Sequence, residues 1–213
     1  MSKIKDGAPP TEKINKSNLK GGTALDWLLQ VDQVILSWFQ SLHAGWLDGL
    51  MVFITSLGNY GAIWFTAGIA LLFFPRYRRY GVLLIAGVIT GYLLGDLVLK
   101  PLVARPRPFV SLPAAKLLIP PPHSYSFPSG HALSSFAAAA ALFLADKRLG
   151  IPACILAVFI AFSRPYLFVH YPTDVLAGAL LGVLIVFTLY GIGKKCGFFP
   201  GRKYFPSTVW KKR

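Results

Sequence analysis

Cysteine and acidic side chains are scarce in this sequence. Its 213 residues include only two cysteines, Cys154 and Cys196, whose spacing fits neither a disulfide framework nor a zinc motif. Asp and Glu total eight, and none lies between residues 97 and 145, so this stretch has no carboxylate cluster for Mg²⁺. Charged residues make up 14% of the chain, against about 25% in a typical soluble domain. The composition therefore argues against a soluble or disulfide-rich domain and favours a membrane protein.

Long apolar segments take the place of the missing charge. Hydrophobic residues make up 54% of the chain, and they are concentrated in residues 46–74, 80–99, 132–145, 151–162 and 175–193. A membrane-spanning helix needs about 20 apolar residues, which the two shorter segments reach only with flanking residues such as His131, Ser163 and Arg164. Polar groups at the membrane boundary are commonly functional. The "GNYG" at 58–61 is expected to divide the first long segment into two helices.

Positive charge is abundant and lies between or outside these segments. The net charge of +14 would suggest a nucleic-acid partner in a soluble protein. Here the "RYRR" at 76–79, the "DKR" at 146–148 and the C-terminal "WKKR" fit the positive-inside rule and attraction to anionic lipids. We therefore expect membrane lipids as partners and no nucleic acid.

The basic loops also predict a topology. With 76–79 and 146–148 in the cytoplasm, the loop 100–127 lies outside. Residues 24–44 include Asp26 and Asp32 and could form an amphipathic helix at the interface, but a crossing there would bring the N-terminal lysines to the cytoplasm. We expect that crossing, and hence an all-α bundle of six transmembrane helices. The predicted domains are a flexible basic cytoplasmic arm (1–23), a membrane domain (24–194) and a basic cytoplasmic tail (195–213).

Three polar clusters meet at the outer end of this predicted bundle. They are "KPLVARPRP" from residue 100, "PSGH" from residue 128 and "SRPYLFVHYPTD" from residue 163. Cations in the outer loop depart from the positive-inside rule, and a bound anion would explain them. Lys100, Arg107 and Arg164 suit phosphate oxygens, and Ser129-Gly130 would present free N–H groups at a helix start. We therefore predict a phosphate-binding site.

Two histidines and one carboxylate supply the chemistry of this site. Pro172 is well placed to begin the last helix, which leaves His170 just before it and Asp174 in its first turn. The Asp174 carboxylate can then hold one ring nitrogen of His170 and leave the other as a nucleophile. His131, at the start of a facing helix, could protonate the leaving oxygen.

In order and spacing these clusters resemble the three motifs of the type 2 phosphatidic acid phosphatase (PAP2) family, K-x6-RP, PSGH and SR-x5-H-x3-D. The match covers residues 100–174 without a departure, and it implies a helical core shared with vanadium haloperoxidases. It further implies a lipid phosphatase that needs no metal or cofactor and forms a phosphohistidine. His170 would be the nucleophile, Asp174 its orienter and His131 the acid and then the base. The implied phosphate ligands are Lys100, Arg107, Ser129, Gly130 and Arg164.

Several assignments stay open at this point. Arg105 and His123, in the outer loop, are candidate headgroup contacts, and Asp96 could be structural or functional. The resemblance fits a bacterial cytoplasmic-membrane enzyme with its active site outside and both termini inside. Its substrate would be undecaprenyl diphosphate, phosphatidylglycerol phosphate or phosphatidic acid, with the prenyl diphosphate ranked first. The alternatives are a haloperoxidase-like enzyme and a non-catalytic lipid-phosphate binder or transporter. No oligomeric state is predicted.

Overall fold

The computed structural model describes residues 24–111 and 117–199, and within these ranges every regular element is a helix. The helices are α1 (Ala24–Ser41), α2 (Gly45–Leu57), α3 (Ala62–Leu72), α4 (Arg78–Tyr92), α5 (Lys100–Val103), α6 (Pro108–Ser111), α7 (Gly130–Ala145), α8 (Lys147–Tyr166) and α9 (Pro172–Lys195). The all-α prediction is confirmed. The predicted arm 1–23 and the tail beyond residue 199 lie outside the described residues.

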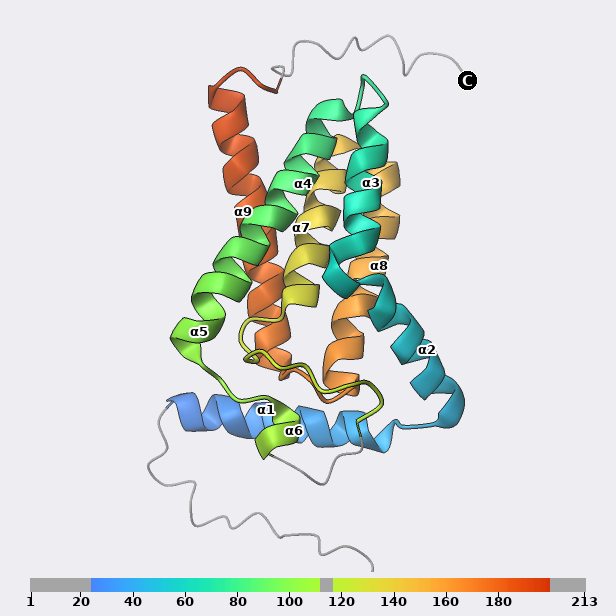
Figure 1. The fold of residues 1–213 in the computed structure, drawn as a ribbon, viewed down its shortest axis with the longest axis vertical. Coiled ribbons are helices and arrows are strands. Elements are labelled where there is room, and N and C mark those ends of the chain that lie inside the picture. The colour runs from blue at the N-terminus through green and yellow to red at the C-terminus, as the bar shows by residue number, and fades with distance from the viewer. Residues whose placement is uncertain (1–23, 112–116, 200–213) are drawn as a thin grey trace, which may run out of the picture.

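Helix α7 runs through the middle of the bundle, with α4, α8 and α9 packed around it (Figure 1). Its buried face is rich in alanine, including Ala137, Ala138 and Ala141. Gly178 and Gly182 of α9 approach the backbone of α7 so closely that an added Cβ would lie 2.5 Å and 2.3 Å from carbonyl oxygens of α7 and its cap. Small residues four apart allow this close contact between helices in membranes.

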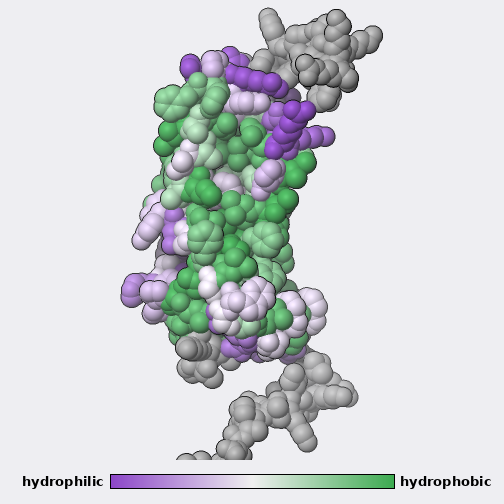
Figure 2. All heavy atoms as spheres, turned by 90° about the vertical axis from the view of Figure 1, so that its right-hand side faces the viewer, coloured by the Kyte–Doolittle hydropathy of each residue, from purple (hydrophilic) through white to green (hydrophobic). Residues whose placement is uncertain are grey.

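The helices that could cross a membrane are fewer than the six expected. In the described part of the chain, Arg78–Ser111, Lys147–Tyr166 and Pro172–Lys195 are long and apolar enough for a span. The pair α2 and α3 qualifies as one bent span, and Gly130–Ala145 is a shorter apolar helix. Figure 2 shows hydrophobic residues over the middle of the molecule and hydrophilic ones gathered at one end. A membrane bundle is supported, but the count of six is not confirmed.

Two helices account for the difference. Gly130–Ala145 is short for a span, and helix α1 lies across the end of the bundle (Figure 1). Three faces run along this helix. Asp32, Leu36 and Phe39 face the protein and are buried, whereas Trp27, Val34 and Trp38 form an exposed apolar stripe. The exposed polar residues Gln30, Gln33, Ser37 and Gln40 make the third face. This pattern is typical of a helix at a membrane interface, where tryptophan is also enriched.

The "GNYG" segment bends the chain as expected. Helix α2 ends at Leu57 and α3 begins at Ala62, and their axes differ in direction by 43°. Tyr60 and Gly61 both have positive φ, 54° and 66°, a conformation that is costly for a residue other than glycine. This bend lies beside the N-terminal half of α7 (Figure 1), so a strained turn borders the region of the predicted site.

Candidate active site

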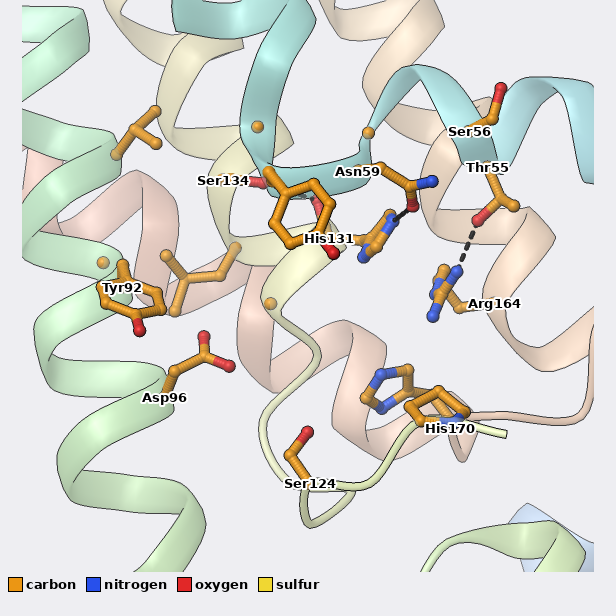
Figure 3. A pocket seen from close by; sticks show the side chains of 18 of the residues that line it. Thr55, Ser56, Asn59, Tyr92, Asp96, Ser124, His131, Ser134, Arg164 and His170 are labelled. Atoms are coloured by element: carbon orange, nitrogen blue, oxygen red, sulfur yellow. Dashed lines mark hydrogen bonds between the residues drawn. The ribbon is translucent and has the colours of Figure 1, made fainter. Parts of the chain in front are cut away.

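A cavity of about 890 Å³ lies between α2, α4, α7 and the loop after α6. Most of the predicted site residues line it, namely Lys100, Arg107, Gly130, His131, Arg164 and His170. Figure 3 shows His131, Arg164 and His170 on one side of the pocket and Tyr92 and Asp96 on the other. Apolar side chains, including Val52, Phe65, Val88, Ile89 and Leu133, complete the wall. The cavity thus combines a cationic part with an apolar part.

Lys100 and Arg107 supply two of the cations, and both are buried. A π-helical turn, Leu93–Leu99, leads from α4 to Lys100, and such turns are frequent at functional sites. The Lys100 ammonium donates to Asp96 Oδ1 and, at 3.4 Å, to Ser124 Oγ. The Arg107 guanidinium donates to the carbonyl oxygens of Ser124 (2.6 Å) and Val169 (2.7 Å). These bonds fix both cations beside the cavity.

Arg164 and the start of α7 face the same region. Arg164 is 4% exposed, and its Nη1 donates to Thr55 Oγ1 at 2.5 Å. Its Nε and the Ser129 Oγ are buried and, among the described residues, have no hydrogen-bond partner. Ser129 precedes α7 without a side-chain cap, so the N–H groups of the first turn are available to an anion. A phosphate could accept hydrogen bonds from all of these donors.

His170 lies between α8 and α9 and is 2% exposed. Its Nε2 is 3.2 Å from Arg107 Nη1. Burial lowers the pKa of His170 well below its usual range, and Arg107, Arg164 and Lys100 lower it further, so the ring is neutral in the free protein. A neutral imidazole has a lone pair available for attack on phosphorus.

Asp174 lies where the sequence predicted, in the first turn of α9, but its contact with His170 is loose. His170 Nδ1 is 3.7 Å from Asp174 Oδ2, too far for a hydrogen bond. The carboxylate instead accepts from Ser126 Oγ (2.5 Å), the Tyr171 N–H (3.0 Å) and Arg105 Nη1 (2.5 Å). In this state the carboxylate is held by neighbours other than the histidine.

His131, in the first turn of α7, is held from the α2–α3 bend. Its Nε2 is 3.1 Å from Asn59 Oδ1 (Figure 3). A Cβ added at Gly58 would lie 2.7 Å from the His131 ring, so glycine leaves the space that the ring occupies. The bend therefore sets the position of this histidine.

The structure gives different positions to Asp96, Arg105 and His123, whose roles the sequence left open. Asp96 lies in the cavity and pairs with Lys100. Arg105 is not a lining residue, because its side chain pairs with Asp32 and Asp174 behind the site. His123 is exposed and lies outside the cavity lining. The geometry thus favours a role at the site for Asp96 and gives no support to headgroup contacts by Arg105 or His123.

Sequence reasoning missed several residues that hold the site together. Thr55 and Asn59 contact Arg164 and His131, and Asp32 and Ser126 contact Arg105 and Asp174. Only Asn59 had a local signal, the "GNYG" turn. No group of three or more His, Cys, Asp or Glu side chains that could hold a metal ion occurs among residues 24–111 and 117–199.

Known proteins resemble this chain over most of its length. The model of the PAP2 superfamily matches residues 76–198. An undecaprenyl-diphosphatase of Sulfolobus acidocaldarius is 41% identical over 142 residues, which cover 66% of this chain and 68% of that protein. Phosphatidylglycerophosphatase B of Bacillus subtilis is 35% identical over 164 residues, which cover 70% of this chain and 77% of that protein.

Solved structures agree with this assignment. The transmembrane PAP2-type phosphatidylglycerolphosphate phosphatase of Bacillus subtilis matches with a TM-score of 0.66 and 28% identity, covering 84% of this chain and 90% of that one. LpxE of Aquifex aeolicus matches with a TM-score of 0.69 and 27% identity, covering 76% and 95%. By its motifs, the matched family region and its fold, the chain belongs to the PAP2 superfamily and is a membrane phosphatase.

Proposed function

We propose that this protein hydrolyses a lipid phosphate or diphosphate through a phosphohistidine intermediate. The observation that carries the proposal is the buried, neutral His170 among the cations Arg107, Arg164 and Lys100, at a cavity whose remaining wall is apolar. The cations would bind the phosphoryl oxygens. The apolar wall would accept the beginning of a lipid chain.

The reaction follows from the placement of the two histidines. His170 Nε2 attacks the terminal phosphorus, and the bond to the leaving oxygen breaks. That oxygen is the lipid oxygen of a phosphomonoester or the bridging oxygen of a diphosphate, which leaves as the lipid monophosphate, and His131 donates a proton to it. Water then attacks the phosphohistidine, gives its proton to His131, and releases inorganic phosphate. The cations and the N–H groups at the start of α7 stabilise the charge on the phosphoryl oxygens in both steps.

We propose a polyprenyl diphosphate as the substrate. Two relatives named undecaprenyl-diphosphatase, from Sulfolobus acidocaldarius and Bacillus subtilis, are 41% and 30% identical to this chain. Phosphatidylglycerophosphatase B, at 35% identity, makes phosphatidylglycerol phosphate the substrate to compare. Phosphate release by the purified protein from undecaprenyl diphosphate, phosphatidylglycerol phosphate and phosphatidic acid tests the proposal, with His170→Ala as the control. Faster release from either glycerolipid would overturn the choice of substrate.

We also propose that the site faces away from the cytoplasm. The exposed basic residues Arg76, Arg78, Lys147 and Lys195 belong to the ends of helices opposite the cavity (Figure 1), and the positive-inside rule assigns that end to the cytoplasm.

Metal independence has a direct test. Lys100, Arg107 and Arg164 can neutralise a bound phosphate without a cation from solution. Activity should survive EDTA, and vanadate should inhibit by occupying the phosphoryl position. Loss of activity in EDTA that Mg²⁺ restores would contradict this expectation.

A further inference from the structure

Arg105 is fixed on four sides by groups that lie behind the cavity. Its Nη1 donates to Asp174 Oδ1 at 2.5 Å and to Thr173 Oγ1 at 2.8 Å. Its Nη2 donates to Asp32 Oδ2 at 2.7 Å. The guanidinium carbon also lies 3.9 Å from the centroid of the Tyr171 ring, within the range of a cation–π contact. The planar fork therefore joins two carboxylates, and its three hydrogen bonds point behind the cavity.

Asp32 is the second carboxylate that Arg105 binds. It lies on α1 and is 0% exposed. Its Oδ1 accepts from the Thr173 N–H at 2.9 Å and its Oδ2 from Thr173 Oγ1 at 2.5 Å. Thr173 lies in the first turn of α9, where N–H groups lack partners within the helix. Asp32 thus caps, from a different helix, the turn that contains Asp174.

The carboxylates of Asp32 and Asp174 are both buried, and both depend on the positive charge of Arg105 between them. Each would be costly to bury alone, and their like charges repel. Arg105 compensates both, and it directs Asp174 Oδ1 away from the ring of His170. The other oxygen, Oδ2, is the one that lies 3.7 Å from His170 Nδ1. Arg105 on Oδ1, together with Ser126 Oγ and the Tyr171 N–H on Oδ2, therefore determines which carboxylate oxygen faces the histidine.

We propose that Asp32 and Arg105 are positioning residues for the nucleophile. Helix α1 fixes Arg105 through Asp32, and Arg105 fixes the Asp174 carboxylate. That carboxylate lies 3.7 Å from His170 Nδ1 and would orient the ring when the two approach to hydrogen-bond distance for attack. Neither Asp32 nor Arg105 touches the substrate. This inference rests on the proposed role of His170, and it makes the helix at the membrane interface part of the catalytic apparatus.

Steady-state kinetics of Asp32→Asn and Arg105→Gln test the inference. Both variants should lower kcat, by up to about 10²-fold as expected for a misplaced reacting group, and change KM little because the phosphate ligands are intact. Arg105→Lys should also be slow, because an ammonium cannot bind both carboxylates as a fork does. Asp26→Asn, the same change at an exposed position of α1, is the matched control and should behave as wild type.

A double-mutant cycle separates positioning from other roles. If the two residues act in one chain of contacts, Asp32→Asn combined with Arg105→Gln should be no slower than the slower single variant. A raised KM in Arg105→Gln with kcat retained would instead make Arg105 a headgroup contact and overturn the inference. Unchanged kcat in Asp32→Asn would overturn it as well. Should a variant not fold, as judged by gel filtration in detergent, Arg105→Lys against wild type decides by the same criteria.

Single-turnover labelling distinguishes failure of this inference from failure of the proposed function. Wild-type protein mixed with p-nitrophenyl [³²P]phosphate should form an acid-labile phosphoenzyme, and the Asp32 and Arg105 variants should form it more slowly. Absence of the phosphoenzyme in wild type would contradict the proposed function itself. Its formation at the wild-type rate in both variants would contradict only the positioning role.

Discussion

Asn59 and His131, which are far apart in the sequence, meet through a hydrogen bond of 3.1 Å between Oδ1 and Nε2. An amide oxygen only accepts hydrogen bonds, so Nε2 is the ring nitrogen that carries the proton in this contact. In the proposed reaction Nδ1 would then exchange the proton with the substrate, donating it from the doubly protonated ring and accepting it in the neutral ring. The turn between α2 and α3 thereby selects the tautomer of the proposed acid and base.

Asn59→Ala should slow hydrolysis of the lipid substrate. We expect a loss of about 2- to 10-fold, the rate equivalent of a hydrogen bond worth about 0.5–1.4 kcal/mol. Turnover of p-nitrophenyl phosphate, whose leaving group needs little protonation, should fall less in its first step. An equal loss in phosphoenzyme formation from both substrates would argue against a contact that acts through His131.

Gly58→Ala should displace the His131 ring through steric contact. The added methyl group would lie 2.7 Å from the His131 ring and 3.0 Å from a methyl of Ile160, so one of them must move. Gly49→Ala, in the helix that Gly58 follows, is the matched control because a Cβ there meets nothing within 4 Å. We expect lower kcat in the first variant and wild-type kcat in the second. Equal rates in the two would show that the ring does not need this space.

The two histidines should differ in the step that fails. His170→Ala should abolish turnover with any leaving group, because no covalent intermediate can form. His131→Ala should still accept phosphate from p-nitrophenyl phosphate but hydrolyse the intermediate slowly, since general acid–base help is typically worth about 10²–10⁴-fold. ³²P labelling should therefore trap phosphoenzyme in the His131 variant. Label trapped in the His170 variant would reverse the assignment.

Asp96→Asn should increase inhibition by inorganic phosphate. The Asp96 carboxylate pairs with Lys100 and lies 3.1 Å from where a Cβ of Gly130 would be. It therefore lies beside the start of α7, where a phosphate is proposed to bind. Without that negative charge, the inhibition constants of phosphate and vanadate should fall about 2- to 5-fold, as for an ion pair worth about 0.4–1 kcal/mol. Weaker inhibition would mean that Asp96 holds Lys100 in position for the ligand.

The orientation of the site can be checked with cysteine labelling in intact cells. Cys196 is exposed just after α9, at the end opposite the cavity, whereas Pro121 is exposed at the cavity end. A membrane-impermeant maleimide should label Pro121→Cys, made in a protein without Cys154 and Cys196, before lysis. The native Cys196 should be labelled only after lysis. The reverse pattern would place the site in the cytoplasm.

The sequence predicted the parts of the site that local patterns encode. Pro172 at the start of α9 predicted that His170 precedes this helix and that Asp174 lies in its first turn, although the predicted contact between them is 3.7 Å long and is not a hydrogen bond. The polar ends of the apolar segments predicted residues that meet at the cavity. Each of these inferences depends only on residues within one helical turn or one loop of the chain. They agree with the structure because helix starts and chain reversals depend on short stretches of sequence.

Other features depend on contacts between distant segments and could not be predicted. The hydrophobicity of residues 24–44 fits either a crossing or an interfacial helix, and the lysines before them favoured the crossing. Asp32 binds α1 to Arg105 and Thr173, and Leu36 and Phe39 pack against residues 166–171, so the contacts of α1 come from segments far away in the sequence. The role of Arg105 stayed open in the sequence for the same reason, because its carboxylate partners come from α1 and α9.

The backbone contact between α7 and α9 has a consequence for how the site tolerates mutation. Gly178 and Gly182 leave no layer of side chains between α7, which contains His131 in its first turn, and α9, which contains Asp174. The separation of these two helices is therefore set by main-chain atoms, which changes elsewhere in the hydrophobic core hardly alter. A single methyl group at either glycine, by contrast, would force the helices of the two proposed catalytic groups apart.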